Sequence, residues 1–196
     1  MSALKQHSLI SVSDYLAGEL VSHVKHEYLG GIVHAMAGAR VVHNTIATNA
    51  LGSLHARLKG RRCRPFNSDM KVRVRLPTQL RFYYPDASVI CRSNAPHDSF
   101  QDDPVVLIEV LSRSTRRVDL GEKKDAYLTI PSLCVYALIE QETAAVVVYR
   151  RTDQGFVRED YEGLDAIIPL TEIETELSLA EIYDGVEFIP EPTDDE

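Results

Sequence analysis

The segment that most constrains the fold is PVVLIEVL at residues 104–111, which is apolar throughout except for Glu109. A short and almost uniformly apolar run is typical of a central β-strand that is covered on both faces. An ionised carboxylate inside such a strand is unfavourable unless a partner compensates its charge. The partner of Glu109 is therefore expected to be an arginine, a proton or a metal ion.

The remaining residues alternate between helical and strand patterns, and no linker or internal repeat divides them. Helices are predicted at residues 14–21 with Ser13 as the N-cap, at 43–59 with Gly60 as the stop, at 118–130 and near 178–183. Strands are predicted at residues 26–37 (a hairpin around Gly30 and Gly31), 69–76, 83–91, 104–111, 133–139, 144–150 and 156–161. These elements predict a single α/β (α+β) domain over residues 1–196, in which helices flank a mixed central β-sheet. Its core spans about residues 14–183, followed by an acidic tail at about 184–196.

Basic residues are concentrated in the middle of a chain whose net charge is -8. Residues 57–81 contain nine lysines and arginines and one acid, and no basic residue follows Arg158. Within this basic segment Lys71, Arg73 and Arg75 alternate on one face of a strand, about 7 Å apart. That spacing is close to the phosphate repeat along a DNA strand, so these three residues are predicted to bind nucleic acid. A solvated strand face would show the same pattern.

The cysteines and the apolar segments bear on where the protein works. Cys63, Cys91 and Cys134 are odd in number and far apart, so we predict buried thiols, with neither a disulfide framework nor a zinc site. The chain shows no secretory leader and no stretch of about 18 uncharged apolar residues. A cytoplasmic protein without a membrane partner is expected.

Asp86 supplies a second carboxylate that the topology can bring to Glu109. It follows Pro85 in YYPDASVI, and Glu109 lies 23 residues further along, in the next long strand pattern. If these strands pair, the two carboxylates point into one cleft and repel each other unless a cation such as Mg²⁺ lies between them. The alternative is that Glu109 pairs with Arg113, Arg116 or Arg117, and that Asp86 is only a turn residue. The pattern leaves both interpretations open.

Five segments resemble the signature blocks of a known family: HEYLGGIV, VHNTIATNAL, YPDASVI, VVLIEVLSRST and RRVDLGEKKDAY. They are similar in order and spacing to the Uma-type restriction endonuclease family, within the PD-(D/E)XK nuclease superfamily, over about residues 14–183. The resemblance implies a restriction-endonuclease-like fold and Mg²⁺-dependent hydrolysis of phosphodiester bonds in DNA. Mn²⁺ is expected to substitute for Mg²⁺, and a homodimer is expected. The alternative is a catalytically silent DNA-binding or protein-interaction module that retains the fold.

The resemblance also implies a four-residue site. Glu27, Asp86 and Glu109 match the three metal-binding acids of the superfamily. The catalytic lysine usually stands two residues after the last acid, but Leu111 occupies that position, and the family's lysine lies instead on the following helix, at Lys123. Helical periodicity alone lets Lys124 reach the same cleft, so Lys124 is the reserve. His43 is interpreted as a surface or capping residue, and Asp119 as a helix partner of Lys123.

Overall fold

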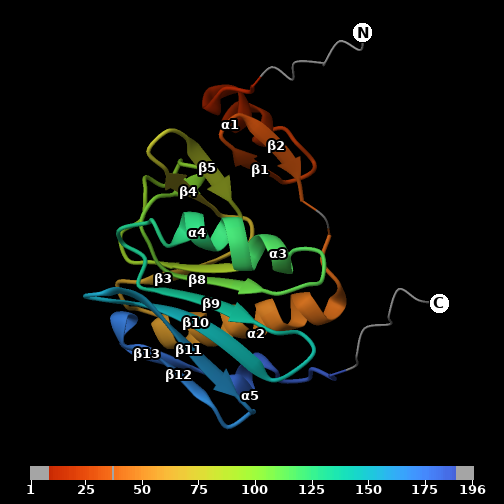
Figure 1. The fold of residues 1–196 in the computed structure, drawn as a ribbon, viewed down its shortest axis with the longest axis vertical. Coiled ribbons are helices and arrows are strands. Elements are labelled where there is room, and N and C mark those ends of the chain that lie inside the picture. Colours follow the sequence, from red (N-terminus) through yellow and green to blue (C-terminus); the bar gives the residue numbers. More distant parts are fainter. Residues whose placement is uncertain (1–8, 37, 189–196) are drawn as a thin grey trace, which may run out of the picture.

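A computed structural model describes residues 9–36 and 38–188, which form three β-sheets and their flanking helices (Figure 1). The central sheet has six strands in the order β11-β10-β9-β8-β6-β3. The strands of this sheet are β3 (Arg64–Asn67), β6 (Ala87–Ile90), β8 (Pro104–Val110), β9 (Val135–Ile139), β10 (Ala145–Thr152) and β11 (Gly155–Glu162). Strands β8 and β9 pair in parallel and the other neighbours pair antiparallel. The predicted mixed central sheet is confirmed.

A second, five-stranded sheet in the order β2-β1-β5-β4-β7 lies above the central sheet in Figure 1. Its strands are β1 (His26–Leu29), β2 (Ile32–Ala35), β4 (Lys71–Arg75), β5 (Leu80–Tyr83) and β7 (Phe100–Gln101). Strands β1 and β2 form the predicted hairpin, and Gly30 and Gly31 both have positive φ, a conformation that glycine adopts without steric cost. A third sheet pairs β12 (Ile167–Leu170) with β13 (Thr175–Ser178), which the sequence patterns did not predict.

The helices cover both faces of the central sheet. They are α1 (Val12–Glu19), α2 (Val41–Leu58), α3 (Arg116–Val118), the π-helical turn η1 (Asp119–Lys123), α4 (Lys124–Tyr127), the 3-10 turn η2 (Thr171–Ile173) and α5 (Leu179–Ile182). Helix α2 packs against one face of the central sheet through Ile46, Ala50 and Leu54. The third sheet and α5 join the same hydrophobic core. The opposite face packs against α4 and the five-stranded sheet.

Alternation along β8 determines where Glu109 points. Val106, Ile108 and Val110 pack in the core on the α2 side, whereas Leu107 and Leu111 pack in the core on the α4 side. Because successive strand residues face opposite sides of a sheet, Glu109 faces α4 and the five-stranded sheet. The candidate site therefore lies between the two larger sheets.

Three local predictions need correction. The strand predicted over residues 83–91 is divided between β5, which ends at Tyr83, and β6, which begins at Ala87. Helix α1 begins two residues earlier than predicted: its N-cap is Ser11, whose hydroxyl oxygen accepts a hydrogen bond from the Asp14 amide at 3.1 Å. The helix predicted over residues 118–130 is interrupted at Gly121, whose φ of -112° and ψ of -105° are not helical. The acidic tail lies partly outside the description, since residues 189–196 are not covered.

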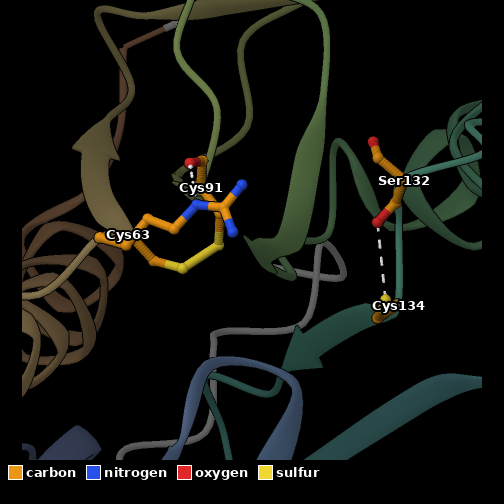
Figure 2. Close-up of a disulfide and its surroundings, with 5 residues drawn as sticks. Cys63, Cys91, Ser132 and Cys134 are labelled. Carbon is orange, nitrogen blue, oxygen red and sulfur yellow. Dashed lines mark hydrogen bonds between the residues drawn. A yellow bond between two sulfur atoms is a disulfide. The ribbon is translucent and has the colours of Figure 1, made fainter.

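The prediction of three buried thiols is wrong for two of them, because Cys63 and Cys91 form a disulfide (Figure 2). The cause is β3, a short edge strand that the sequence patterns did not reveal. It pairs antiparallel with β6, with Arg64 opposite Ile90, and this register brings the preceding cysteine to the one that follows β6. Cys134 remains a thiol and donates a hydrogen bond to the Ser132 carbonyl oxygen.

In the described part of the chain, no helix has the length and apolar character needed to cross a membrane.

Candidate active site

Asp86 and Glu109 come together because β6 and β8 pair antiparallel. Ala87 is opposite Ile108, so the residue before β6 lies beside the end of β8. Asp86 Oδ2 accepts a hydrogen bond from the backbone amide of Val110 at 2.7 Å. The strand pairing assumed from the sequence is confirmed, and Asp86 is bonded to the strand that carries Glu109.

Glu109 is almost fully enclosed, with 3% of its surface exposed. Its Oε1 accepts a hydrogen bond from the Tyr127 hydroxyl at 3.1 Å and lies 2.9 Å from Lys123 Nζ. Burial raises the pKa of Glu109 well above its usual range; Lys123 opposes this rise, while Asp119 and Asp86 add to it. Lys123 is thus the cationic partner of Glu109.

Of the three arginines considered as partners of Glu109, Arg117 is exposed and the other two contact different acids. Arg116 forms a two-bond ion pair with Glu140, at 2.7 Å for each bond. Arg113 lies 4.0 Å from Glu142. The cation that compensates the charge of Glu109 is Lys123, in the helical segment that follows β8.

The π-helical turn η1 brings Lys123 into the space between the sheets. Its Nζ lies 2.9 Å from Glu109, 3.2 Å from Glu27 and 3.7 Å from Asp119. Burial by itself lowers the pKa of Lys123, but the three carboxylates outweigh it and raise the pKa above its ordinary value. Lys123 is consequently a charged ammonium group surrounded by acids.

Lys124 points elsewhere. Its Nζ lies 3.8 Å from Asp125 and 5.3 Å from the centre of the Tyr149 ring. Of the two lysines that the sequence left as candidates, the geometry brings Lys123 to the acids.

Glu27 approaches the same ammonium group from the five-stranded sheet. Strand β1 carries it, and β1 pairs with β5 so that Tyr28 is opposite Phe82. Glu27 Oε1 also accepts a hydrogen bond from the Tyr84 backbone amide at 3.3 Å. The four predicted site residues therefore come from four segments, and Lys123 contacts both Glu27 and Glu109 directly.

From the sequence, Asp119 and His43 were not expected to be catalytic or metal-binding residues. Asp119 is the predicted helix partner of Lys123, but it is also buried in the cluster, and burial raises its pKa, with Asp86 and Glu27 adding to the rise. His43 is not a plain surface or capping residue, because its Nε2 lies 3.2 Å from Asp86 Oδ2. The position of His43 at the start of a long helix was visible in the sequence, but its contact depends on how α2 packs.

The donor set suits a hard divalent cation. The raised pKa values of Glu109 and Asp119 reflect neighbouring carboxylates as well as burial, so additional positive charge would stabilise the cluster. Across residues 9–36 and 38–188, no three acid, histidine or cysteine side chains are grouped as a ready metal site. Mg²⁺ commonly takes only one or two carboxylates and completes its octahedron with waters and substrate phosphate oxygens. Asp86 and Glu109 satisfy that lesser requirement.

The three basic residues of β4 are not equivalent. Lys71 is 4% exposed and points inward, so the expectation of a common solvent-facing row is wrong for this residue. Arg73 forms two hydrogen bonds of 2.7 Å with Asp102, whereas the Arg75 side chain is 61% exposed and forms one longer hydrogen bond of 3.4 Å with the same carboxylate. Helix α1 causes the difference, because its Tyr15 covers the end of the strand where Lys71 lies. Binding to phosphate stays a prediction.

Comparison with known proteins agrees with this fold. A family model described as "Uma2: Putative restriction endonuclease" matches residues 12–181. The uncharacterized protein slr1290 of Synechocystis sp. is 31% identical over 91% of this chain and 94% of its own length. The uncharacterized protein sll1609 of the same organism is 30% identical over 86% of this chain and 96% of its own length.

A solved structure shares the fold. A putative nuclease belonging to DUF820 from Anabaena variabilis superposes with a TM-score of 0.68 and 20% identity, covering 85% of this chain and 93% of its own. The architecture is thus that of the restriction-endonuclease-like nucleases. The chain belongs to the Uma2 family, whose description is "Putative restriction endonuclease", and this family places it in the class of nucleases.

Proposed function

We propose that this nuclease is a Mg²⁺-dependent endonuclease that hydrolyses phosphodiester bonds of DNA. The observation that carries the proposal is the contact of Lys123 with Glu109 and Glu27, beside Asp86, in a chain of this family. Asp86 and Glu109 would hold the cation, with Glu27 at the edge of the same site. The bound metal supplies Lewis acidity toward a phosphoryl oxygen and lowers the pKa of a bound water.

The protonation state of Lys123 determines its role in the proposed reaction. Because three carboxylates raise its pKa, Lys123 carries its proton and does not act as a general base. Its N–H groups instead donate hydrogen bonds, which orient the attacking water and stabilise negative charge on the phosphate. The water oxygen would form a bond to phosphorus and release its proton to solvent, while the bond from phosphorus to the leaving sugar oxygen breaks and that oxygen takes up a proton from solvent. A homodimer would place one such site on each strand of a duplex.

The burial of Glu109 also serves this scheme. A carboxylate fixed on a central strand and bonded to Tyr127 keeps its position when the cation and substrate arrive, so little reorganisation is required. Glu109→Gln preserves the shape and removes the charge. We therefore expect this variant to fold and to bind Mn²⁺ poorly.

The test compares the two adjacent lysines. Supercoiled plasmid DNA and short single-stranded and double-stranded oligonucleotides are incubated with Mg²⁺ or Mn²⁺, and Mn²⁺ binding is measured by calorimetry. Lys123→Ala should lower the cleavage rate by about 10²-fold or more while Mn²⁺ still binds, because the lysine acts on the water and is not a ligand. Lys124→Ala is the matched control and should cleave as the wild type does.

Further variants separate the competing outcomes. Asp86→Ala and Glu109→Ala should lose both Mn²⁺ binding and cleavage. A wild-type protein that binds Mn²⁺ and DNA without cleaving DNA or RNA would be a binding module that retains the nuclease fold. Unchanged Mn²⁺ affinity in Glu109→Ala would show that the cation site lies elsewhere.

A further inference from the structure

His43 links three elements at the end of the central sheet. It stands in the first turn of α2, and its Nε2 lies 3.2 Å from Asp86 Oδ2. Asp86 Oδ2 in turn accepts a hydrogen bond from the backbone amide of Val110, the last residue of β8. One side chain thereby connects α2, the segment before β6 and the strand that carries Glu109.

The same oxygen of Asp86 has two polar neighbours. The Val110 amide donates a hydrogen bond to Asp86 Oδ2 at 2.7 Å, and His43 Nε2 lies 3.2 Å from the same oxygen. Two polar neighbours restrict the rotation of a carboxyl group more narrowly than one does, since each acts from a different direction. The orientation of the Asp86 carboxylate therefore depends on α2 as well as on β8.

Helix α2 is a rigid support for this contact. Its 18 residues are held by Ile46, Ala50 and Leu54, all of which are fully buried against the central sheet. A side chain in the first turn of a helix anchored in this way has little freedom to drift. The His43 imidazole is largely enclosed, with 16% of its side chain exposed.

We propose that His43 is a positioning residue that orients Asp86 for the catalytic cation. The inference rests on the proposed function, in which Asp86 is a metal ligand. Residues that hydrogen-bond a metal ligand orient it and tune its affinity, and removing them typically weakens metal binding by about 10- to 100-fold. His43 touches Asp86 and acts through it.

The experiment uses two substitutions of different chemistry. His43→Leu keeps a similar volume and removes both ring nitrogens, whereas His43→Gln places an amide nitrogen close to the position of Nε2. We expect the Mn²⁺ dissociation constant to rise by about 10- to 100-fold in His43→Leu and to return to within about threefold of the wild-type value in His43→Gln. His55→Leu, a change of the same kind on the exposed side of α2, should bind Mn²⁺ as the wild type does.

A second measurement needs no metal. In metal-free protein, hydrogen exchange of the Val110 amide reports its bond to Asp86, and His43→Leu should speed this exchange by about tenfold as the carboxylate is released. Equal exchange in the wild type and His43→Leu would overturn the positioning role. So would a lower melting temperature combined with an unchanged Mn²⁺ dissociation constant, which is the result expected of a residue that only stabilises the fold.

The two arms also separate the failure of this inference from that of the proposed function. A wild-type protein that does not bind Mn²⁺ refutes the metal-dependent mechanism, and with it the role of His43 toward a cation. Wild-type binding with no difference between His43→Leu and His55→Leu refutes only the inference about His43.

Discussion

Two lysines in this molecule are buried to nearly the same extent, yet their surroundings differ. Lys123 is 5% exposed and lies among Glu27, Glu109 and Asp119. Lys71 is 4% exposed and donates a hydrogen bond to the Tyr84 hydroxyl at 3.2 Å. Burial lowers the pKa of Lys71, with Glu19 opposing, whereas the carboxylates around Lys123 raise its pKa.

The comparison teaches that burial alone does not mark a functional lysine. Lys71 lies near the faces of the Tyr15 and Tyr84 rings, 5.9 Å and 5.3 Å from their centres, and its aliphatic stem fills space beneath α1. Lys123 is surrounded by acids, and the pKa values of two of them, Glu109 and Asp119, are raised. A group of mutually perturbed titratable residues is the more specific sign of a catalytic centre.

The largest expected difference between the lysines concerns stability. Lys123→Met leaves buried carboxylates without their cation and should lower the free energy of unfolding by about 3–5 kcal/mol. Lys71→Met exchanges an ammonium group for a thioether of similar length beside aromatic rings, and should change it by about 1 kcal/mol or less. Urea denaturation at pH 7 in the presence of EDTA measures both. Equal losses would mean that burial, and not the neighbouring carboxylates, sets the cost.

The second difference appears in the pH dependence of stability. The folded pKa of Lys71 lies below its ordinary value of 10.5, so between these two values the unfolded chain binds more protons than the folded one. The wild type should therefore become more stable relative to Lys71→Met as the pH rises toward 10.5, by up to about 1.4 kcal/mol per pH unit.

Lys123 provides the contrast in the same experiment. Its folded pKa is raised, so its stabilising contribution is complete below 10.5 and is lost only at higher pH. Between pH 8 and pH 10, titration of Lys123 should therefore not change the difference in free energy of unfolding between the wild type and Lys123→Met. A gap for Lys71→Met that is equally level would contradict the lowered pKa of Lys71.

The smallest expected effect concerns the strand that carries Lys71. If the exposed part of β4 contacts DNA, Arg75→Gln should reduce the slope of log binding constant against log salt by about 0.9, the value for one phosphate contact. Arg73→Gln should leave the slope unchanged, because the guanidinium group of Arg73 already donates two hydrogen bonds to Asp102. Fluorescence anisotropy titrations with sodium chloride measure both slopes. A similar decrease in both variants would place Arg73 on phosphate as well.

The sequence predicted the parts of the site that depend on local pattern. The apolar run around Glu109 identified a strand covered on both faces. The pattern of residues 83–91 identified its neighbour, although that strand begins only at Ala87. Glu109 lies near the end of β8, where alternation along the strand sets the direction of its side chain. Asp86 lies directly before β6, and the pairing of β6 with β8 brings the two residues together. Gly30 and Gly31 likewise predicted the turn between β1 and β2.

Contacts between distant segments were not readable in the same way. The choice between Lys123 and Lys124 depends on the irregular turn at Gly121, which helical periodicity does not reveal. Lys71 points inward because α1 covers its strand, and the Cys63–Cys91 disulfide follows from a strand pairing with β3 that has no sequence signal of its own. His43 reaches Asp86 only through the packing of α2.

Tyr84 has a consequence for how the chain can be shortened. Its backbone amide bonds Glu27 and its hydroxyl bonds Glu19, on α1, at 2.8 Å. A truncated chain that begins at His26 would retain Glu27, Asp86, Glu109 and Lys123, and would lose the acceptor that fixes the Tyr84 ring. A fragment that keeps the candidate site intact is therefore expected to start before α1, although α1 contributes none of the four predicted residues.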